Sequence, residues 1–379
     1  MSNTTSYKNN KLKRETSLDL LRGIAVLLMV LAHTIPFLHT SPRGLLLILQ
    51  ILGDTLCFTI FLLVSGASSY FAYLRNTDQE WIPKRVRLLK RLLKLLIGYY
   101  FVAIISSLQD FPIPPNHIWI KNVIQILVFI KVPGYTEFLL PFIFYGFLVL
   151  LFRHRLRTLV EKKRLIIILV PLTYLLGYVI HKVPLPSPLV YYKSLIAGEA
   201  DWFRFPLLQY SGVFLIGILL GQLLERETFN RTRQLLLIKF TFISVIVLLS
   251  AFVLELYAHF PYIQEFRRWP PSITFIALGL SFSFIMLLLI HTKIEVTIFK
   301  LLRESIAFLG KFAFGIYTSH IVILQLEELL FGYKFSQTWQ VLASYILLML
   351  ICAFLIPIIR LFSYNSIKRL KNPQTWESK

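Results

Sequence analysis

The chain has 379 residues, of which 56% are apolar, 15% aromatic and only 16% charged, and its formal net charge is +21. A soluble domain of this length carries about a quarter charged residues, so the composition excludes an ordinary soluble enzyme and indicates a polytopic membrane protein. The positive charge could point to nucleic acid. We expect no such partner, because the cations alternate along the chain in the way that sets membrane topology.

Ten apolar segments recur along the chain, and most have close to the twenty or so residues that a bilayer core requires. They predict an all-α polytopic membrane protein with about ten transmembrane helices. The segments are residues 17–33, 45–74, 92–108, 138–152, 165–180, 205–224, 237–258, 273–290, 306–323 and 341–362. We therefore divide the chain into a basic tail (1–16), one transmembrane domain (17–362) and a second tail (363–379).

Lysine and arginine collect on one side of the predicted helices. The two tails and the loops at 75–94 and 153–164 are rich in them, whereas the alternate loops hold few. The positive-inside rule then predicts that both termini are cytoplasmic. An apolar stretch at 117–130 would reverse the later loops if it crossed the bilayer. We interpret it as an interfacial or re-entrant helix on the outer side, since Trp119 and Lys121 suit the headgroup region.

The first predicted helix holds two ionisable side chains, Arg22 and His33, with only uncharged residues between them. Eleven residues make about three helical turns, so both side chains lie on nearly the same face, roughly 16 Å apart along the axis. An ionisable group in a lipid-spanning helix costs about 2.5–3.5 kcal/mol and usually faces the bundle interior or a wet cavity. This pair is therefore the strongest functional lead in the chain.

A basic stripe precedes and enters the third apolar segment. Its cations recur at helical spacing, and they are Lys84, Arg87, Arg91 and Lys94. Such a stripe suits an anionic lipid headgroup or the phosphates of a nucleotide-bearing donor. Charge alone favours the plainer interpretation, which is an ordinary juxtamembrane cluster that sets topology.

Two predicted outer loops, 109–137 and 181–204, are longer than a simple connection needs and contain several prolines and aromatic residues. Loops of this kind on one side of a membrane protein are candidates for binding an acceptor. The alternative is that each loop only caps the helix bundle.

Several segments, taken in order, resemble the acyltransferase-3 family of integral membrane acyltransferases. Residues 18–33 match its signature of Arg, ten residues and His, and residues 57–66 resemble its apolar run ending in Ser-Gly. Arg91-Leu-Leu-Lys94 is similar to its Arg-x-x-Arg element, with Lys94 in place of the second Arg and Gly98 in place of a Pro. Three later segments resemble further elements of the family. They are residues 137–142, which lack the usual Trp, residues 210–221 and residues 308–320.

The resemblance implies a ten-helix bundle in a bacterial inner membrane. Such a protein takes an acyl group, expected to be acetyl, from cytoplasmic acetyl-coenzyme A and delivers it to an extracytoplasmic carbohydrate or glycolipid. Acyl-coenzyme A is then a substrate, and no tightly bound cofactor is expected. Related heparan-type N-acetyltransferases share several of these patterns, so the acceptor atom stays open between oxygen and nitrogen.

Acyl transfer from a thioester needs a base, a donor group for the developing oxyanion and a way to hold phosphates. His33 suits the base, because an imidazole exchanges protons near neutral pH, and an acyl-histidine intermediate stays open. Arg22 could bind a phosphate or the thioester carbonyl of the donor. Asp19, three residues earlier, can fix the Arg22 guanidinium by a hydrogen bond; the alternative is a salt bridge at the membrane edge that only orients the helix.

Further side chains are candidates for supporting roles. Those expected to orient the base or shape the acceptor path are Asp54, Tyr317 and His320. Those expected to hold the donor phosphates are Lys84, Arg87, Arg91 and Lys94. Those expected on the acceptor side are Glu137, Glu199, Asp201 and Trp202. For His320 a buried structural role is an equal alternative, and for each carboxylate a solvated or capping role stays open.

Other chemistries find little support in the sequence. It holds no Gly-rich phosphate loop, no H-E-x-x-H zinc motif and no G-x-S-x-G nucleophile elbow. Cys57 and Cys352 fall inside predicted spans, where we interpret them as packing residues, and no metal site is expected. The main alternative function is a transporter or flippase for a glycolipid or proton-coupled solute, because ionisable residues inside spans also mark translocation paths. A noncatalytic partner in an envelope polysaccharide complex is the third hypothesis.

Overall fold

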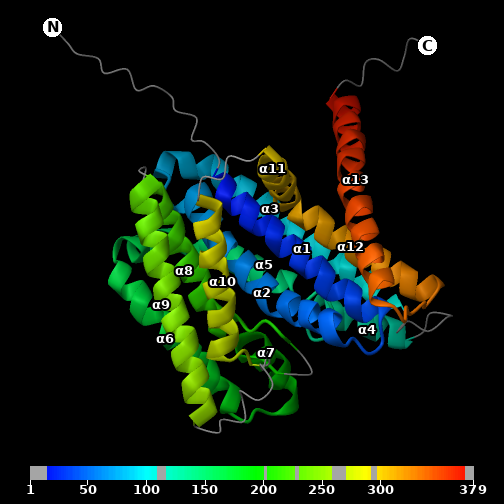
Figure 1. Ribbon diagram of the computed structural model, residues 1–379, viewed down its shortest axis with the longest axis horizontal. Coiled ribbons are helices and arrows are strands. Elements are labelled where there is room, and N and C mark those ends of the chain that lie inside the picture. The colour runs from blue at the N-terminus through cyan, green and yellow to red at the C-terminus, as the bar shows by residue number, and fades with distance from the viewer. Residues whose placement is uncertain are drawn as a thin grey trace.

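The computed structural model describes residues 15–108, 117–199, 203–226, 230–257, 270–291 and 297–371, and these ranges are almost entirely helical (Figure 1). The helices are α1 (Thr16–Leu38), α2 (Gly44–Ser69) with its π-helical extension η1 (Tyr70–Leu74), α3 (Asp78–Ser106), α4 (His117–Leu127), α5 (Leu139–Glu161), α6 (Lys163–Lys182), α7 (Ser187–Ala197), α8 (Leu207–Arg226), α9 (Asn230–Tyr257), α10 (Ile273–His291), α11 (Thr297–Lys311), α12 (Ala313–Leu330) and α13 (Thr338–Lys371). The prediction of an all-α membrane protein is confirmed.

The predicted membrane spans correspond to helices except at 306–323, which crosses the break between α11 and α12. Among the described residues, eight helices are long and apolar enough to cross a membrane, and nine if α11 and α12, bent by 76° at their junction, form one broken span. The third predicted span lies in α3, a 29-residue helix whose first half carries the basic stripe. Helix α4 has 11 residues, too few to cross a bilayer, so the stretch at 117–130 adds no span.

Helices α1 and α2 run side by side through the middle of the molecule (Figure 1). Glycine lets their neighbours approach closely, as is common where membrane helices pack. A Cβ added to Gly310 of α11 would lie 1.8 Å from the Asp19 carbonyl oxygen of α1, and one added to Gly66 of α2 would lie 2.2 Å from the Phe214 carbonyl oxygen of α8. These contacts place α11 against the N-terminal half of α1, where Arg22 lies.

Candidate functional site

A cavity of about 580 Å³ lies between α1, α2, α3, α5 and the junction of α11 with α12. Its volume falls in the usual range for small-molecule sites. The residues that α2 and its extension contribute run from Phe61 through Ser65 and Ser68 to Arg75, a rise of about 21 Å along the helix. Along this helix the lining begins at the aromatic Phe61, passes two serines and ends at Arg75, whose guanidinium lies 5.1 Å over the ring of Phe71.

The two ends of the cavity differ in chemistry. The charged lining residues are Glu15, Asp19, Arg22, Arg75, Arg91 and Lys311. The aromatic end is a cluster of rings in contact, Phe61, Phe138, Phe142 and Tyr317, while Phe71 lies beside Arg75 at the charged end. Because four of the charged groups are basic and two acidic, the charged end favours an anion. The aromatic end favours an apolar or neutral group.

The Arg22 guanidinium is held from two helices. Its Nη1 donates to Oδ1 of Asp19 at 2.9 Å, and its Nη2 donates to Oγ of Ser68 on α2 at 2.8 Å. Asp19 is only 2% exposed, so this pair is far less screened than a surface ion pair. The contact expected between Asp19 and Arg22 is therefore present, and it presents the guanidinium to the cavity in one orientation.

His33 contacts a second histidine on another helix. Its Nδ1 lies 3.0 Å from Nε2 of His320 on α12, and the two ring planes differ by 9°. The ring of Tyr135 meets the His33 ring edge-on, with centroids 4.9 Å apart. His320 is fully buried, whereas His33 is partly exposed. The fold thus joins two residues that are 287 positions apart.

Tyr317 lies between the cavity and the histidine pair. Its ring lines the cavity, stacks on Phe138 at 5.3 Å and lies 6.0 Å from the ring of His320. Its hydroxyl donates to the backbone carbonyl oxygen of Tyr135. Burial raises the pKa of Tyr135 to about 12, so that phenol also keeps its proton at neutral pH. Tyr317 therefore connects the cavity lining with the histidine pair, and His33 is not among the described residues that line the cavity.

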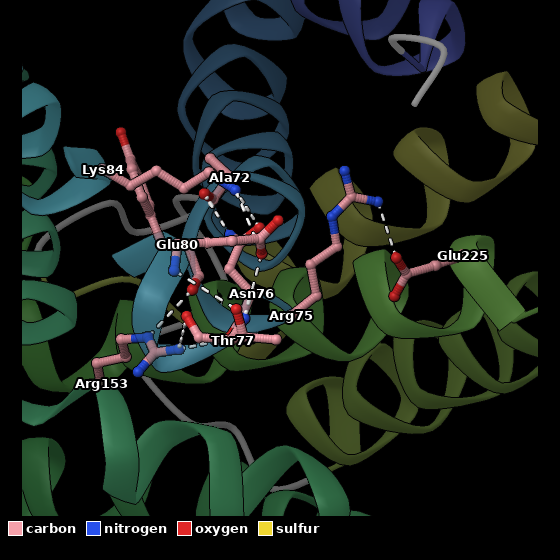
Figure 2. Close-up of polar contacts among 9 residues, drawn as sticks. Ala72, Arg75, Asn76, Thr77, Glu80, Lys84, Arg153 and Glu225 are labelled. Atoms are coloured by element: carbon pink, nitrogen blue, oxygen red, sulfur yellow. Dashed lines mark hydrogen bonds and ion pairs between the residues drawn. The ribbon is translucent and has the colours of Figure 1, made fainter. Parts of the chain in front are cut away.

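Arg75 enters the cavity from the end of η1. Its Nη1 donates to Oε1 of Glu225 at 2.8 Å (Figure 2). The hydroxyl of Tyr70 donates to Oε2 of the same carboxylate at 2.7 Å. The Arg75 backbone N–H donates to the Tyr70 carbonyl oxygen at 3.2 Å, which is the five-residue step of a π-turn. We had placed Arg75 in a topology-setting loop, since a π-turn leaves no clear mark in the sequence.

A buried arginine fixes the turn that follows Arg75. Arg153 of α5, 2% exposed, donates to Oδ1 of Asp78 at 2.6 Å and to the carbonyl oxygens of Tyr73 and Asn76 (Figure 2). The hydrogen bond from Arg153 holds the pKa of Asp78 below its usual value. Arg153 therefore stabilises the connection between η1 and α3. We expected it at the start of a basic loop, but it lies within helix α5 and is buried.

The four residues of the predicted phosphate-binding stripe do not share one location in the structure. Arg91 lines the cavity, whereas Arg87 and Lys94 are exposed on α3. Lys84 donates to Oδ1 of Asn76 and lies 3.8 Å from Glu80, so it belongs to the turn shown in Figure 2. Lys311 also lines the cavity; it was not predicted as a site residue, although it lies within the segment at 308–320 that resembles the family.

The acceptor-side candidates are placed as follows. Glu137 pairs with Arg204, whose Nε lies 3.2 Å from Oε1 and whose backbone N–H donates to Oε2 at 2.9 Å. Glu199 lies 2.7 Å from Nζ of Lys193. Both carboxylates are thus held in ion pairs. Asp201 and Trp202 lie outside the described residues.

The remaining candidates are polar or sulfur-containing side chains. Asp54 is half-buried on α2. Burial of Tyr135 is the main cause that raises the pKa of Tyr135, and the negative charge of Asp54 raises it further. Cys57 and Cys352 are both buried and form no disulfide. Within the described ranges, no group of three His, Cys, Asp or Glu side chains could hold a metal ion.

Comparison with known families gives a match over most of the chain. Residues 15–357 match the model of the acyltransferase-3 family, described as an acyltransferase domain. None of the curated proteins matches the chain. Because the family match covers nearly the whole sequence, the protein belongs to the acyltransferase-3 family and is a multi-pass membrane acyltransferase.

Proposed function

We propose that this membrane acyltransferase moves an acetyl group from acetyl-coenzyme A to a hydroxyl of an extracytoplasmic carbohydrate or glycolipid. It would act in a bacterial inner membrane, with both termini in the cytoplasm. The observation that carries the proposal is the graded cavity, whose basic end and aromatic end suit the two ends of an acyl thioester of coenzyme A.

The basic end is suited to the donor phosphates. Arg22, Arg75, Arg91 and Lys311 line it, and guanidinium groups bind phosphate oxygens with paired hydrogen bonds. Arg22 and His33 lie roughly 16 Å apart along α1, so one reacting carbonyl cannot touch both. We therefore assign Arg22 to the phosphates or to the arm of the donor, rather than to the thioester carbonyl.

His33 is the proposed base. It takes the proton of the acceptor hydroxyl as that oxygen attacks the thioester carbonyl carbon. The carbon–sulfur bond then breaks, the thiolate of coenzyme A takes the proton from His33, and the acceptor leaves as an ester. Transfer through an acyl-histidine would use the same atoms in two steps. The donor arm must pass Tyr317 to bring its thioester to His33.

The test is acyl release from radiolabelled acetyl-coenzyme A by purified protein in vesicles. Wild type should release or transfer label, and His33→Ala and Arg22→Ala should both lose this activity while remaining folded and inserted. His154→Ala is a matched control, because His154 is exposed on α5. Full activity in His33→Ala would contradict the assignment of the base.

Two outcomes would favour the other functions. Solute flux across the vesicle membrane in the absence of any acyl donor would favour a transporter or flippase. Donor binding too weak to measure in the folded wild type would favour a noncatalytic partner in an envelope complex.

A further inference from the structure

The hydrogen bonds around His320 fix where its proton lies. Its Nδ1 is 2.8 Å from the backbone carbonyl oxygen of Ile316, and its Nε2 is 3.0 Å from Nδ1 of His33. A carbonyl oxygen only accepts, so Nδ1 of His320 must carry a hydrogen. A neutral imidazole has one N–H, and therefore Nε2 of His320 is an acceptor.

This assignment determines the protonation of His33. Because Nε2 of His320 accepts, Nδ1 of His33 must donate, and the lone pair of the neutral His33 ring then lies on its Nε2. The opposite arrangement would require His320 to donate from both nitrogens as a cation. His320 is fully buried, and Ile316 and Leu324, one turn before it and one turn after it on the same helix, are buried as well. A charge there would cost several kcal/mol of desolvation.

The ring geometry supports a strong, directional bond. The two centroids lie 5.3 Å apart with nearly parallel planes. This separation equals the 3.0 Å between the nitrogens extended by one ring radius of about 1.15 Å at each end, so the N–H points along the line between the rings. The rings are therefore in line and nearly coplanar, rather than stacked face to face.

We propose that His320 is a positioning residue that holds His33 as the tautomer with a hydrogen on Nδ1 and a basic Nε2. This inference rests on the proposed function in so far as His33 is the base. When Nε2 of His33 takes the acceptor proton, the bond from Nδ1 to His320 becomes charge-assisted and stabilises the imidazolium. The proton returns from Nε2 to the leaving thiolate, and His320 keeps its own hydrogen throughout. The role is that of the carboxylate in a catalytic triad, taken here by a neutral ring.

A pair of substitutions separates this role from simple packing. In His320→Gln the side-chain oxygen can accept from Nδ1 of His33, whereas His320→Leu has a similar volume and no acceptor. We expect His320→Leu to lose about 10- to 100-fold in kcat with an unchanged KM for acetyl-coenzyme A, and His320→Gln to lose much less. Ile321→Leu, at the neighbouring buried position, controls for altered packing. Equal losses in His320→Gln and His320→Leu would overturn the acceptor role.

A second measurement does not depend on activity. Nitrogen-15 NMR of histidine-labelled wild type, with the His33 signals identified from their absence in His33→Gln, should show a protonated Nδ1 and an unprotonated Nε2 at neutral pH. An unprotonated Nδ1 would refute the proposal even if acyl transfer is confirmed. If the NMR shows the expected tautomer but the protein transfers no acyl group, the inference about His320 holds and the proposed function fails.

Discussion

The contact between Gly310 and α1 makes a sharp prediction about packing and donor binding. In Gly310→Ala the new Cβ would lie 1.8 Å from the Asp19 carbonyl oxygen and 2.8 Å from the Gly23 backbone nitrogen. Ordinary contact begins at 3.4 Å, so α11 and α1 must separate by about 1.6 Å. Since both obstructing atoms belong to the backbone, no side chain can rotate away. Asp19 also holds Arg22, so the separation should disturb the cavity.

The expected magnitude comes from two opposing effects. Overpacking of this kind costs about 1–3 kcal/mol, while replacing a helical glycine by alanine gains about 1 kcal/mol. Gly310→Ala should therefore lower the free energy of unfolding by up to about 2 kcal/mol and raise the KM for acetyl-coenzyme A. Gly315→Ala is the matched control, because its Cβ would meet only Cγ1 of Ile356 at 3.8 Å, and it should gain up to about 1 kcal/mol. Thermal unfolding measures the stability of both variants, and titration with acetyl-coenzyme A measures their donor binding. Equal stability of the two variants would refute the reasoning.

Three further changes test other contacts. Asp19→Asn removes the charge that orients Arg22, and it should weaken donor binding about 10- to 150-fold in a titration, as expected for loss of a charged hydrogen bond of about 1.5–3 kcal/mol. Tyr317→Phe leaves a buried loop carbonyl without its hydroxyl donor, and it should lower the free energy of unfolding by about 1–3 kcal/mol in thermal melts. The hydrogen bond from Arg153 lowers the pKa of Asp78 in the folded protein. This pairing therefore stabilises the folded state above the unfolded pKa of Asp78, and the stabilisation is lost as pH falls through the folded pKa. Amide exchange at 74–78, corrected for intrinsic rates, should speed up on acidification.

Local periodicity predicted the contacts that lie within one helix. The eleven-residue spacing placed Arg22 and His33 on one face of α1, and Val26 and Met29 between them are fully buried. The three-residue spacing placed Asp19 against Arg22, where it forms a hydrogen bond. These contacts depend only on the rise and turn of an α-helix.

Contacts between helices could not be predicted in the same way. Helical spacing put Lys84 on one stripe with Arg91, but α3 faces the cavity at Arg91 and Leu95, while Lys84 is held by the preceding turn. Lys311 and Arg75 enter the cavity where regular helix stops, at the bend between α11 and α12 and at the end of η1. Such breaks arise from packing rather than from a residue pattern.

Helix α1 sets the distance between the two parts of the proposed reaction. Arg22 and His33 belong to one continuous helix, so their separation of roughly 16 Å is fixed by the rise per residue and does not depend on any loop. The cavity around Arg22 is lined by the middle of α3, the C-terminal half of α2, η1, the α11–α12 junction and the start of α5. A continuous helix therefore holds the basic group and the base at a constant spacing. On the proposed function, the donor arm must match this spacing, and analogues with a shortened arm should bind the charged end without reaching His33.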